Sequence, residues 1–188
     1  GGVCTMSEKV TIKVERKTLH LPTIALRGLV VFPNNLVHFE VGREKSIAAV
    51  EWAMANNSNV FLVAQKSMDT TEPQQADLFS YGVVAEVKQV LRVSGDLVKV
   101  LVEGKYRAKL SALDASGDFL LSEVRPAPVR AGKADDAVET EALLRALKAG
   151  FDEYLGMNPR LGKDVVFAIV SSDDPAFLSE YMPANLLF

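Results

Sequence analysis

The stretch that decides the fold runs from Leu21 to Met54 and reads LPTIALRGLVVFPNNLVHFEVGREKSIAAVEWAM. It places an apolar strand, a Phe-Pro turn, a second strand and a helix in one run of chain. Pro33 cannot donate a hydrogen bond to a sheet, and Asn34 and Asn35 favour a turn. No group of side chains here is typical of an active site, so the stretch indicates a role other than chemistry.

The chain on either side alternates apolar and polar residues from Leu19 to about Pro126. Segments such as VVAEVKQVLRV, DLVKVLVEG and FLLSEV are rich in β-branched residues and bounded by Gly, Ser, Asp or Pro, which predicts strands. Val98, Val100 and Val102 share one face, and we expect them to point inward together. The glycine in VSGD, between two of these strands, predicts a hairpin.

One helix interrupts this pattern. Residues 43–56, REKSIAAVEWAMAN, carry a broad apolar stripe of Ile47, Val50, Trp52 and Met54, and this stripe predicts an amphipathic helix. The polar segment 66–79, KSMDTTEPQQADLF, predicts a mobile surface loop. The first part of the chain is therefore expected to be a β-rich lobe with one inserted helix.

The hydrophobic period changes after about residue 130. Helical spacing predicts an amphipathic helix over residues 137–155, with Asp136 as its N-cap. Asn158-Pro159 and Asp174-Pro175 each place a capping residue before a proline, which predicts the starts of two further helices. The apolar residues 186–188 then end the chain without a polar tail, so we expect a truncated helical lobe with apolar surface left in water.

Composition restricts the class of protein. Of 188 residues, 48% are apolar and 24% charged, a composition typical of a globular protein. The net charge of −3 argues against general electrostatic binding of nucleic acid. Cys4 is the single cysteine, so no intrachain disulfide forms and a reducing compartment fits. No segment resembles a membrane span or secretory signal, and we expect a cytoplasmic protein. Cys4 precedes a plausible start at Met6, and residues 1–6 are expected to be vector-derived.

A search for catalytic motifs finds none. Gly156, Gly162 and Lys163 come near a Walker A loop, but the glycine spacing is wrong and Asp164 stands where a hydroxyl is needed to hold magnesium. There are 2 histidines, and no metal-ligand spacing surrounds either. No G-x-S-x-G elbow is present. We therefore expect no catalytic residues, no metal site and no cofactor in this chain.

The opening stretch resembles the N-terminal domain of the Lon ATP-dependent protease family. In that family an L-P-x-x-x-L-R segment, a V-x-F-P turn and a V-G-R before a helix recur, and this chain has LPTIALR, VVFP and VGR. The likeness continues through VFLVAQK, YGVVAEVKQVL and VKVLVEGKYRAKL, and covers roughly residues 19–126. One departure is that a proline expected between the Phe-Pro turn and V-G-R is absent from NLVHFEVGR.

The resemblance implies an α+β fold. A PUA-like β-barrel lobe with one inserted helix is expected over residues 7–128, and a small helical lobe over residues 129–188. It also implies a non-catalytic domain that captures unfolded or damaged proteins and helps to hold a hexamer of Lon subunits. The ATPase and Ser-Lys protease domains of the family, with their ATP and magnesium, have no counterpart in this sequence.

A receptor for unfolded proteins needs a shallow apolar patch, because such proteins differ from folded ones by their exposed apolar segments. The candidate substrate-binding residues are those of the Phe-Pro turn: Leu29, Phe32, Pro33 and Leu36. The alternative is that these side chains plug one end of the barrel, and for any single residue the sequence favours the plug. An exposed sheet edge that adds an extended peptide is a second candidate.

Two other classes of function stay open. A stand-alone PUA-like module could bind RNA or another protein, although the cationic row of Lys105, Arg107 and Lys109 has no interleaved aromatic residues for base stacking. Tyr106, Ala108 and Leu110 are expected to form the buried side of that strand. A stand-alone enzyme of unfamiliar type is the third class, and the missing catalytic constellation argues against it.

Overall fold

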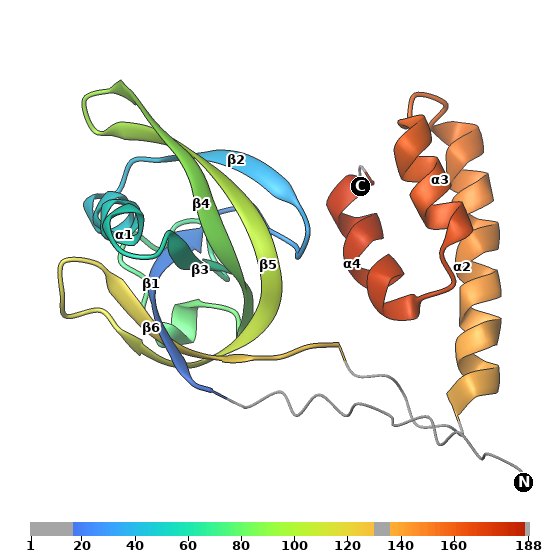
Figure 1. Ribbon diagram of the computed structural model, residues 1–188, viewed down its shortest axis with the longest axis horizontal. Helices are drawn as coiled ribbons and strands as arrows, with labels where there is room; N and C mark the ends of the chain where they lie inside the picture. The colour runs from blue at the N-terminus through green and yellow to red at the C-terminus, as the bar shows by residue number, and fades with distance from the viewer. Residues whose placement is uncertain (1–16, 130–135, 187–188) are drawn as a thin grey trace, which may run out of the picture.

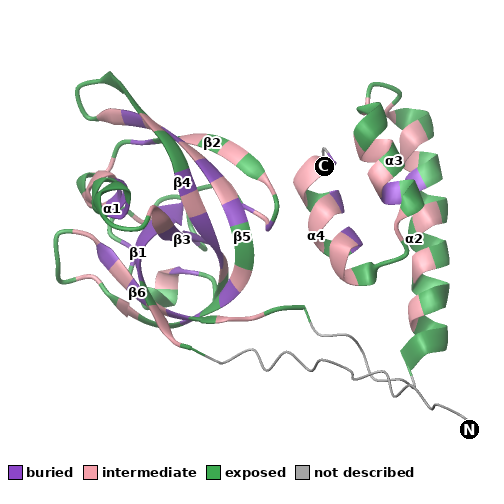
Figure 2. Cartoon of the chain, viewed as in Figure 1, coloured by how far each residue is buried: buried purple, intermediate pink, exposed green. Residues whose placement is uncertain are grey.

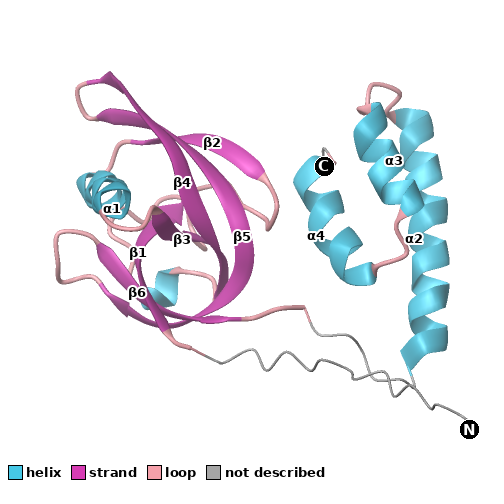
Figure 3. Cartoon of the chain, in the orientation of Figure 1, coloured by secondary structure: helices cyan, strands magenta, loops and turns pink. Residues whose placement is uncertain are grey.

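The computed structural model describes residues 17–129 and 136–186, which form a β-rich lobe followed by a helical lobe (Figure 1). The predicted vector-derived residues 1–6 lie outside the described residues. The predicted α+β class, with one helix inserted in a β lobe and helices after it, is confirmed (Figure 3). The strands are β1 (Leu19–Leu26), β2 (Leu36–Val41), β3 (Asn59–Ala64), β4 (Tyr81–Ser94), β5 (Leu97–Asp114) and β6 (Leu120–Pro126).

The strands form one sheet of 6, in the order β2-β5-β4-β3-β1-β6. An additional pairing between β5 and β6 closes the sheet into a barrel, and β2 extends it beyond the closure. β1 and β3 are parallel, and the other neighbours are antiparallel. Gly95, with φ of +45°, occupies the turn between β4 and β5, so the predicted hairpin is confirmed. A glycine adopts this left-handed conformation without steric cost.

Buried residues lie along the strands (Figure 2) and form two apolar clusters on opposite faces of the sheet, because Phe61 and Leu62, neighbours in β3, belong to different clusters. Val98, Val100 and Val102 are buried together, as the alternation predicts. Ala108 and Leu110 are also buried, whereas Tyr106 of the same expected row is exposed. The period of two therefore identifies the buried side of β5 at these positions except at Tyr106, which lines the cleft beside the helical lobe.

Helix α1 (Glu44–Ala55) covers the barrel with only part of the predicted stripe, because Val50 is buried and Ile47 packs against the apolar cluster. Its buried residues are Ser46, Ala49, Val50 and Ala53, while Trp52 and Met54 are 41% and 44% exposed. The buried set follows the i, i+3, i+4, i+7 spacing of one helix face. Small side chains on this face let the helix approach the strands closely. Trp52 instead contacts Phe119, with 5.7 Å between ring centroids.

The polar segment predicted to be a mobile surface loop is anchored to the barrel. Leu78 is buried and forms a bridge with Gln65, and a short 3-10 helix, η1 (Gln75–Asp77), precedes it. The buried amide of Gln65 donates to the carbonyl oxygens of Ser67 and Thr70 at 3.1 and 2.9 Å. Buried polar groups require such partners, and here they hold the loop against the sheet.

The second lobe has helices α2 (Ala137–Met157), α3 (Lys163–Ser171) and α4 (Pro175–Asn185). As predicted, Asp174 caps α4: its carboxylate accepts a hydrogen bond of 2.9 Å from the N–H of Ala176. The prediction for Asn158 is wrong, because its side-chain amide donates to the carbonyl oxygen of Tyr154 and it ends α2. Helix α3 begins only at Lys163, after Gly162.

The helical lobe has an apolar core of its own: Phe151, Ile169, Leu178, Met182 and Leu186. Leu186, which the sequence placed at an apolar end left in water, is buried in this core at 8% exposure. Residues 187–188 lie outside the described residues. Separate cores predict that the two lobes unfold separately.

We therefore expect Leu178→Ala to melt the helical lobe selectively. Leu178 is 1% exposed, and truncating a buried leucine costs about 2–5 kcal/mol of unfolding free energy. The single tryptophan, Trp52, lies in the β lobe, so its fluorescence reports that lobe alone. Circular dichroism should show an earlier helical transition, while the fluorescence midpoint stays unchanged.

The matched control is Val60→Ala, which truncates a fully buried residue of the β lobe and should lower the fluorescence midpoint. An equal fall of both midpoints for Leu178→Ala would show that the lobes unfold as one unit.

Candidate functional site

The Phe-Pro turn is held against β5 at a glycine. The N–H of Asn34 donates to the carbonyl oxygen of Gly104, and the N–H of Gly104 donates to that of Asn35, both at 2.9 Å. A Cβ atom at Gly104 would lie 2.2 Å from the carbonyl oxygen of Phe32. No side chain fits in that space, so glycine is what allows the turn to cross β5 here.

The 4 predicted contact residues differ in how far they are buried. Leu29 is half-buried and packs against the main apolar cluster of the barrel, as the plug alternative expects. Phe32 is half-buried and Pro33 is buried. Leu36, the first residue of β2, is 60% exposed, and Val30, which the sequence reasoning passed over, is 58% exposed. The turn thus combines a buried base with an exposed apolar rim.

The turn also forms part of a cleft between the two lobes, where α4 lies closest to the barrel (Figure 1). The cleft has a volume of about 370 Å³, and an ion pair of 3.5 Å between Arg107 and Glu180 spans it. The barrel side is formed by Pro33, Asn34, Lys105, Tyr106, Arg107, Pro128 and Val129, and the helical side by Asp174, Ala176, Phe177, Glu180 and Tyr181.

Aromatic rings dominate the helical wall of this cleft. Phe177 and Tyr181 stack with 4.8 Å between their ring centroids, and Tyr106 on the opposite wall is 38% exposed. Sequence reasoning missed this wall because α4 is joined to the cleft only by tertiary packing. The one local signal was the i, i+4 spacing of the two rings, which is equally typical of a helix core.

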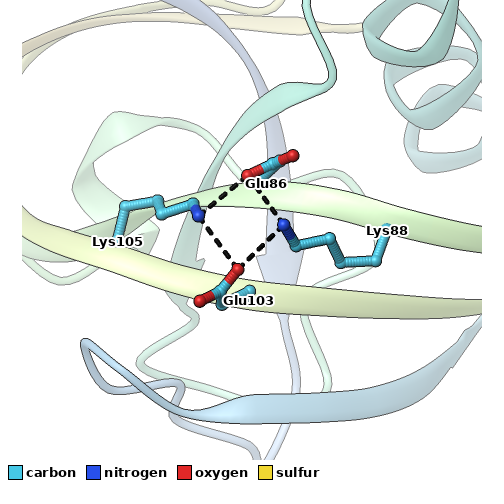
Figure 4. A network of polar contacts seen from close by, with 4 residues as sticks. All are labelled: Glu86, Lys88, Glu103 and Lys105. Carbon is cyan, nitrogen blue, oxygen red and sulfur yellow. Dashed lines mark hydrogen bonds and ion pairs between the residues drawn. The ribbon is translucent and has the colours of Figure 1, made fainter.

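Next to Gly104, a network of four charged residues covers β4 and β5 (Figure 4). Glu86 and Glu103 stand directly opposite each other, which alone would be repulsive. Lys88 lies 3.0 and 2.9 Å from their carboxylates, and Lys105 lies 2.8 and 2.9 Å from them. Each lysine therefore bridges both glutamates and neutralises the pair.

This network changes the proton affinity of its members. Hydrogen bonds from Lys105 and then Lys88 lower the pKa of Glu103 to about 2 and also lower the pKa of Glu86. Hydrogen bonds to the same carboxylates raise the pKa of both lysines. A carboxylate with a lowered pKa stabilises the fold above its unfolded pKa of about 4.5, and this contribution is lost as the pH falls through about 2. The network therefore stays charged at neutral pH.

Within the described residues, no group of three or more His, Cys, Asp or Glu side chains is arranged to hold a metal ion. His20 and His38 are both exposed, on different strands. Among residues 17–129 and 136–186, no helix is long and apolar enough to cross a membrane.

We expect Gly104→Ala to displace the Phe-Pro turn. The new Cβ would collide with the backbone carbonyl of Phe32, and relieving such an overlap costs typically about 1–3 kcal/mol. Thermal unfolding should shift downward, and the amide of Asn34 should lose its protection from hydrogen exchange. Gly117→Ala is the control, because its Cβ would meet its nearest atom at 3.7 Å, and unchanged exchange at Asn34 in Gly104→Ala would contradict the docking.

We expect Lys105→Met to raise the pKa of Glu103 from about 2 toward 4.5, since the variant removes the main hydrogen-bond donor to that carboxylate. An NMR titration of the side-chain carboxyl carbon measures this change. Lys109→Met, on the same strand but outside the network, should leave the titration unchanged. Titration of Glu103 near 4.5 in the parent protein would refute the network in solution.

Comparison with known proteins agrees with this architecture. The chain matches the ATP-dependent protease La (LON) substrate-binding domain over residues 20–188. The Lon protease of Desulforamulus reducens is 36% identical over 166 residues, which are 88% of this chain and 20% of that protein. The Lon protease of Escherichia coli K12 is 37% identical over 168 residues, covering 89% of this chain and 21% of that protein.

A solved structure shows the same fold. The N-terminal domain of Mycobacterium avium complex Lon protease superposes with a TM-score of 0.63 at 20% identity, covering 87% of this chain and 81% of that chain. The chain spans about a fifth of the length of the curated relatives it matches. The resemblance seen in the Phe-Pro stretch is confirmed over the β lobe and the helices alike, and this chain belongs to the family of Lon substrate-binding domains.

Proposed function

We propose that this chain is the substrate-recognition part of an ATP-dependent Lon protease and captures unfolded or damaged proteins for degradation. The observation that carries the proposal is the match to the Lon substrate-binding domain over residues 20–188. Its partners are then unfolded polypeptides and the other subunits of a Lon hexamer. The cytoplasm is the compartment that a chain with one cysteine favours.

The surface around the Phe-Pro turn supports this role. Leu36 and Val30 expose apolar area beside the turn, and the inter-lobe cleft adds the rings of Tyr106, Phe177 and Tyr181. Exposed apolar groups of this kind recognise the apolar segments that distinguish unfolded from folded proteins. We assign the contact to Leu36 and the half-buried Phe32, with Leu29 and the buried Pro33 supporting them from the core side.

A shallow surface of this kind binds weakly. Association costs consume most of the apolar gain, so the affinity of a single copy for an unfolded protein should be about micromolar or weaker. Several copies in one hexamer would raise the overall affinity for an unfolded protein through avidity. Chemistry and ATP use belong in this proposal to the ATPase and protease domains of the family, which bring their own magnesium and nucleophile.

The ion pairs of the barrel count against an RNA-binding module. Lys105 is neutralised by two glutamates, and Arg107 pairs with Glu180. Counterion release, which drives nucleic-acid binding, requires cations that are not already paired with carboxylates. The predicted cationic row is therefore a poor track for phosphates.

We expect the chain to bind a reduced and denatured model protein in preference to its native form. Leu36→Ser should weaken that binding about threefold to tenfold and leave the melting temperature unchanged, because an exposed side chain contributes little to stability. Binding is measured by fluorescence anisotropy and melting by calorimetry. The same preparation should leave ATP and casein intact.

The control is Leu91→Ser, which removes an equally exposed leucine from the β4–β5 hairpin, where Leu91 is 52% exposed. Equal binding of native and denatured protein would contradict the proposed function. A fall in binding for Leu91→Ser as large as for Leu36→Ser would remove the turn as the contact site.

A further inference from the structure

Strand β2 is an edge of the sheet that no other described strand covers. It pairs with β5 from Leu36 opposite Glu103 to Val41 opposite Val98, and it stands at the end of the strand order. In an antiparallel pair, the backbone N–H and C=O of every second residue turn away from the partner strand. About three residues of β2 therefore present unpaired donors and acceptors on its free side.

β2 has few of the features that usually block an exposed edge. Leu36–Val41 contains no Pro, Lys or Arg, its one charged residue is Glu40, and its register with β5 is continuous. The distal half of β4 is protected differently, by register shifts and by an ion pair from Arg92 to Glu51 of α1. Bulges and edge charges are the usual means of preventing strand addition. An additional extended chain could therefore pair with the free edge of β2.

A cavity of about 310 Å³ lies beside this edge. Its lining residues come from β1, the loop that follows it, the end of β2 and the start of α1, and none comes from β5. Leu26, Leu29 and Phe39 give it an apolar wall, and Arg27, Glu40 and Arg43 add charged groups. The remaining lining residues are Ile24, Ala25, Val41, Gly42 and Ser46.

We propose that an extended segment of an unfolded polypeptide adds to the sheet along the free edge of β2 and inserts an apolar side chain into the cavity beside Leu29 and Phe39. This inference rests on the proposed function and names the way in which the substrate is held. Only a chain with unpaired N–H and C=O groups can satisfy those of β2, and a folded protein has already paired its own.

The side chains of β2 indicate what the added strand should look like. Val37 and Phe39 pack against the main apolar cluster, whereas Leu36, His38 and Glu40 are exposed. Successive residues of a strand point to opposite faces of the sheet. The preferred segment therefore alternates apolar residues, which extend the core face, with polar residues, and the backbone pairing makes it tolerant of sequence.

Backbone pairing can be tested with peptides that share one set of side chains. A short peptide of alternating Leu and Thr is compared with two versions that carry N-methyl groups on alternate residues, one version for each set of amides. An added strand turns one set of amides toward β2 and the other toward solvent. One methylated version should lose at least about tenfold in affinity and the other should keep it, because pairing with β2 needs only one set. Equal binding of all peptides would overturn the proposal.

Hydrogen exchange locates the site. Adding the unmodified peptide should protect amides of β2 that exchange rapidly in the free protein, while those of α4 stay unchanged. Leu29→Trp, which fills the cavity, should weaken peptide binding about tenfold, and Leu91→Trp on the hairpin should not. Unchanged exchange throughout β2 would overturn the inference even if Leu29→Trp fails to fold.

Two further outcomes separate the possible occupants. Protection of β2 in the free protein that grows with concentration, together with a dimer in sedimentation, would assign the edge to a second copy of this chain and overturn the inference. Binding of denatured protein without protection of β2 would overturn the inference and leave the proposed function standing. Failure to bind denatured protein at all would contradict the proposed function itself.

Discussion

The architecture depends on one strand that changes partners along its length. β5 pairs with β4 over most of its course, with β2 as far as Glu103, and with β6 from Ala108 onward. Register shifts in the β4–β5 and β5–β6 pairs increase the local twist that lets one strand serve both neighbours. Gly104 lies just beyond Glu103, the last residue of β5 that pairs with β2. The Phe-Pro turn crosses β5 at this glycine.

The candidate site follows from this change of partner. Between the β2 and β6 pairings, β5 contributes Lys105, Tyr106 and Arg107 to the cleft beside the helical lobe. Their charges are largely satisfied within the protein, through the glutamate network on one side and Glu180 on the other. What the surface can offer a partner is therefore apolar area and backbone hydrogen bonds. Neither depends on a particular sequence, which suits a receptor for unfolded chains.

Much of the fold could be predicted because it is fixed by local chemistry. The alternation of Val98, Val100 and Val102, the glycine of the β4–β5 turn and the Asp174 cap depend on neighbours in sequence, and the structure has all of them. Two of the errors concern choices between two local possibilities. Trp52 is apolar and helical, yet small residues of α1 face the barrel because they allow closer packing. Asn158 suits either end of a helix, and it ends α2 because its amide reaches the carbonyl of Tyr154.

The sequence by itself determined the lobes, the family and the Phe-Pro turn, since each is encoded in residues that are adjacent along the chain. Only the tertiary structure decided which side chains of the turn face water. Leu29 packs on the apolar cluster before the turn, whereas Leu36 is exposed where β2 begins at the end of the sheet. The aromatic wall of α4 and the free edge of β2 are likewise products of folding. A strand becomes an edge only through the pairing of strands far apart in sequence, and a single strand's composition carries no record of that pairing.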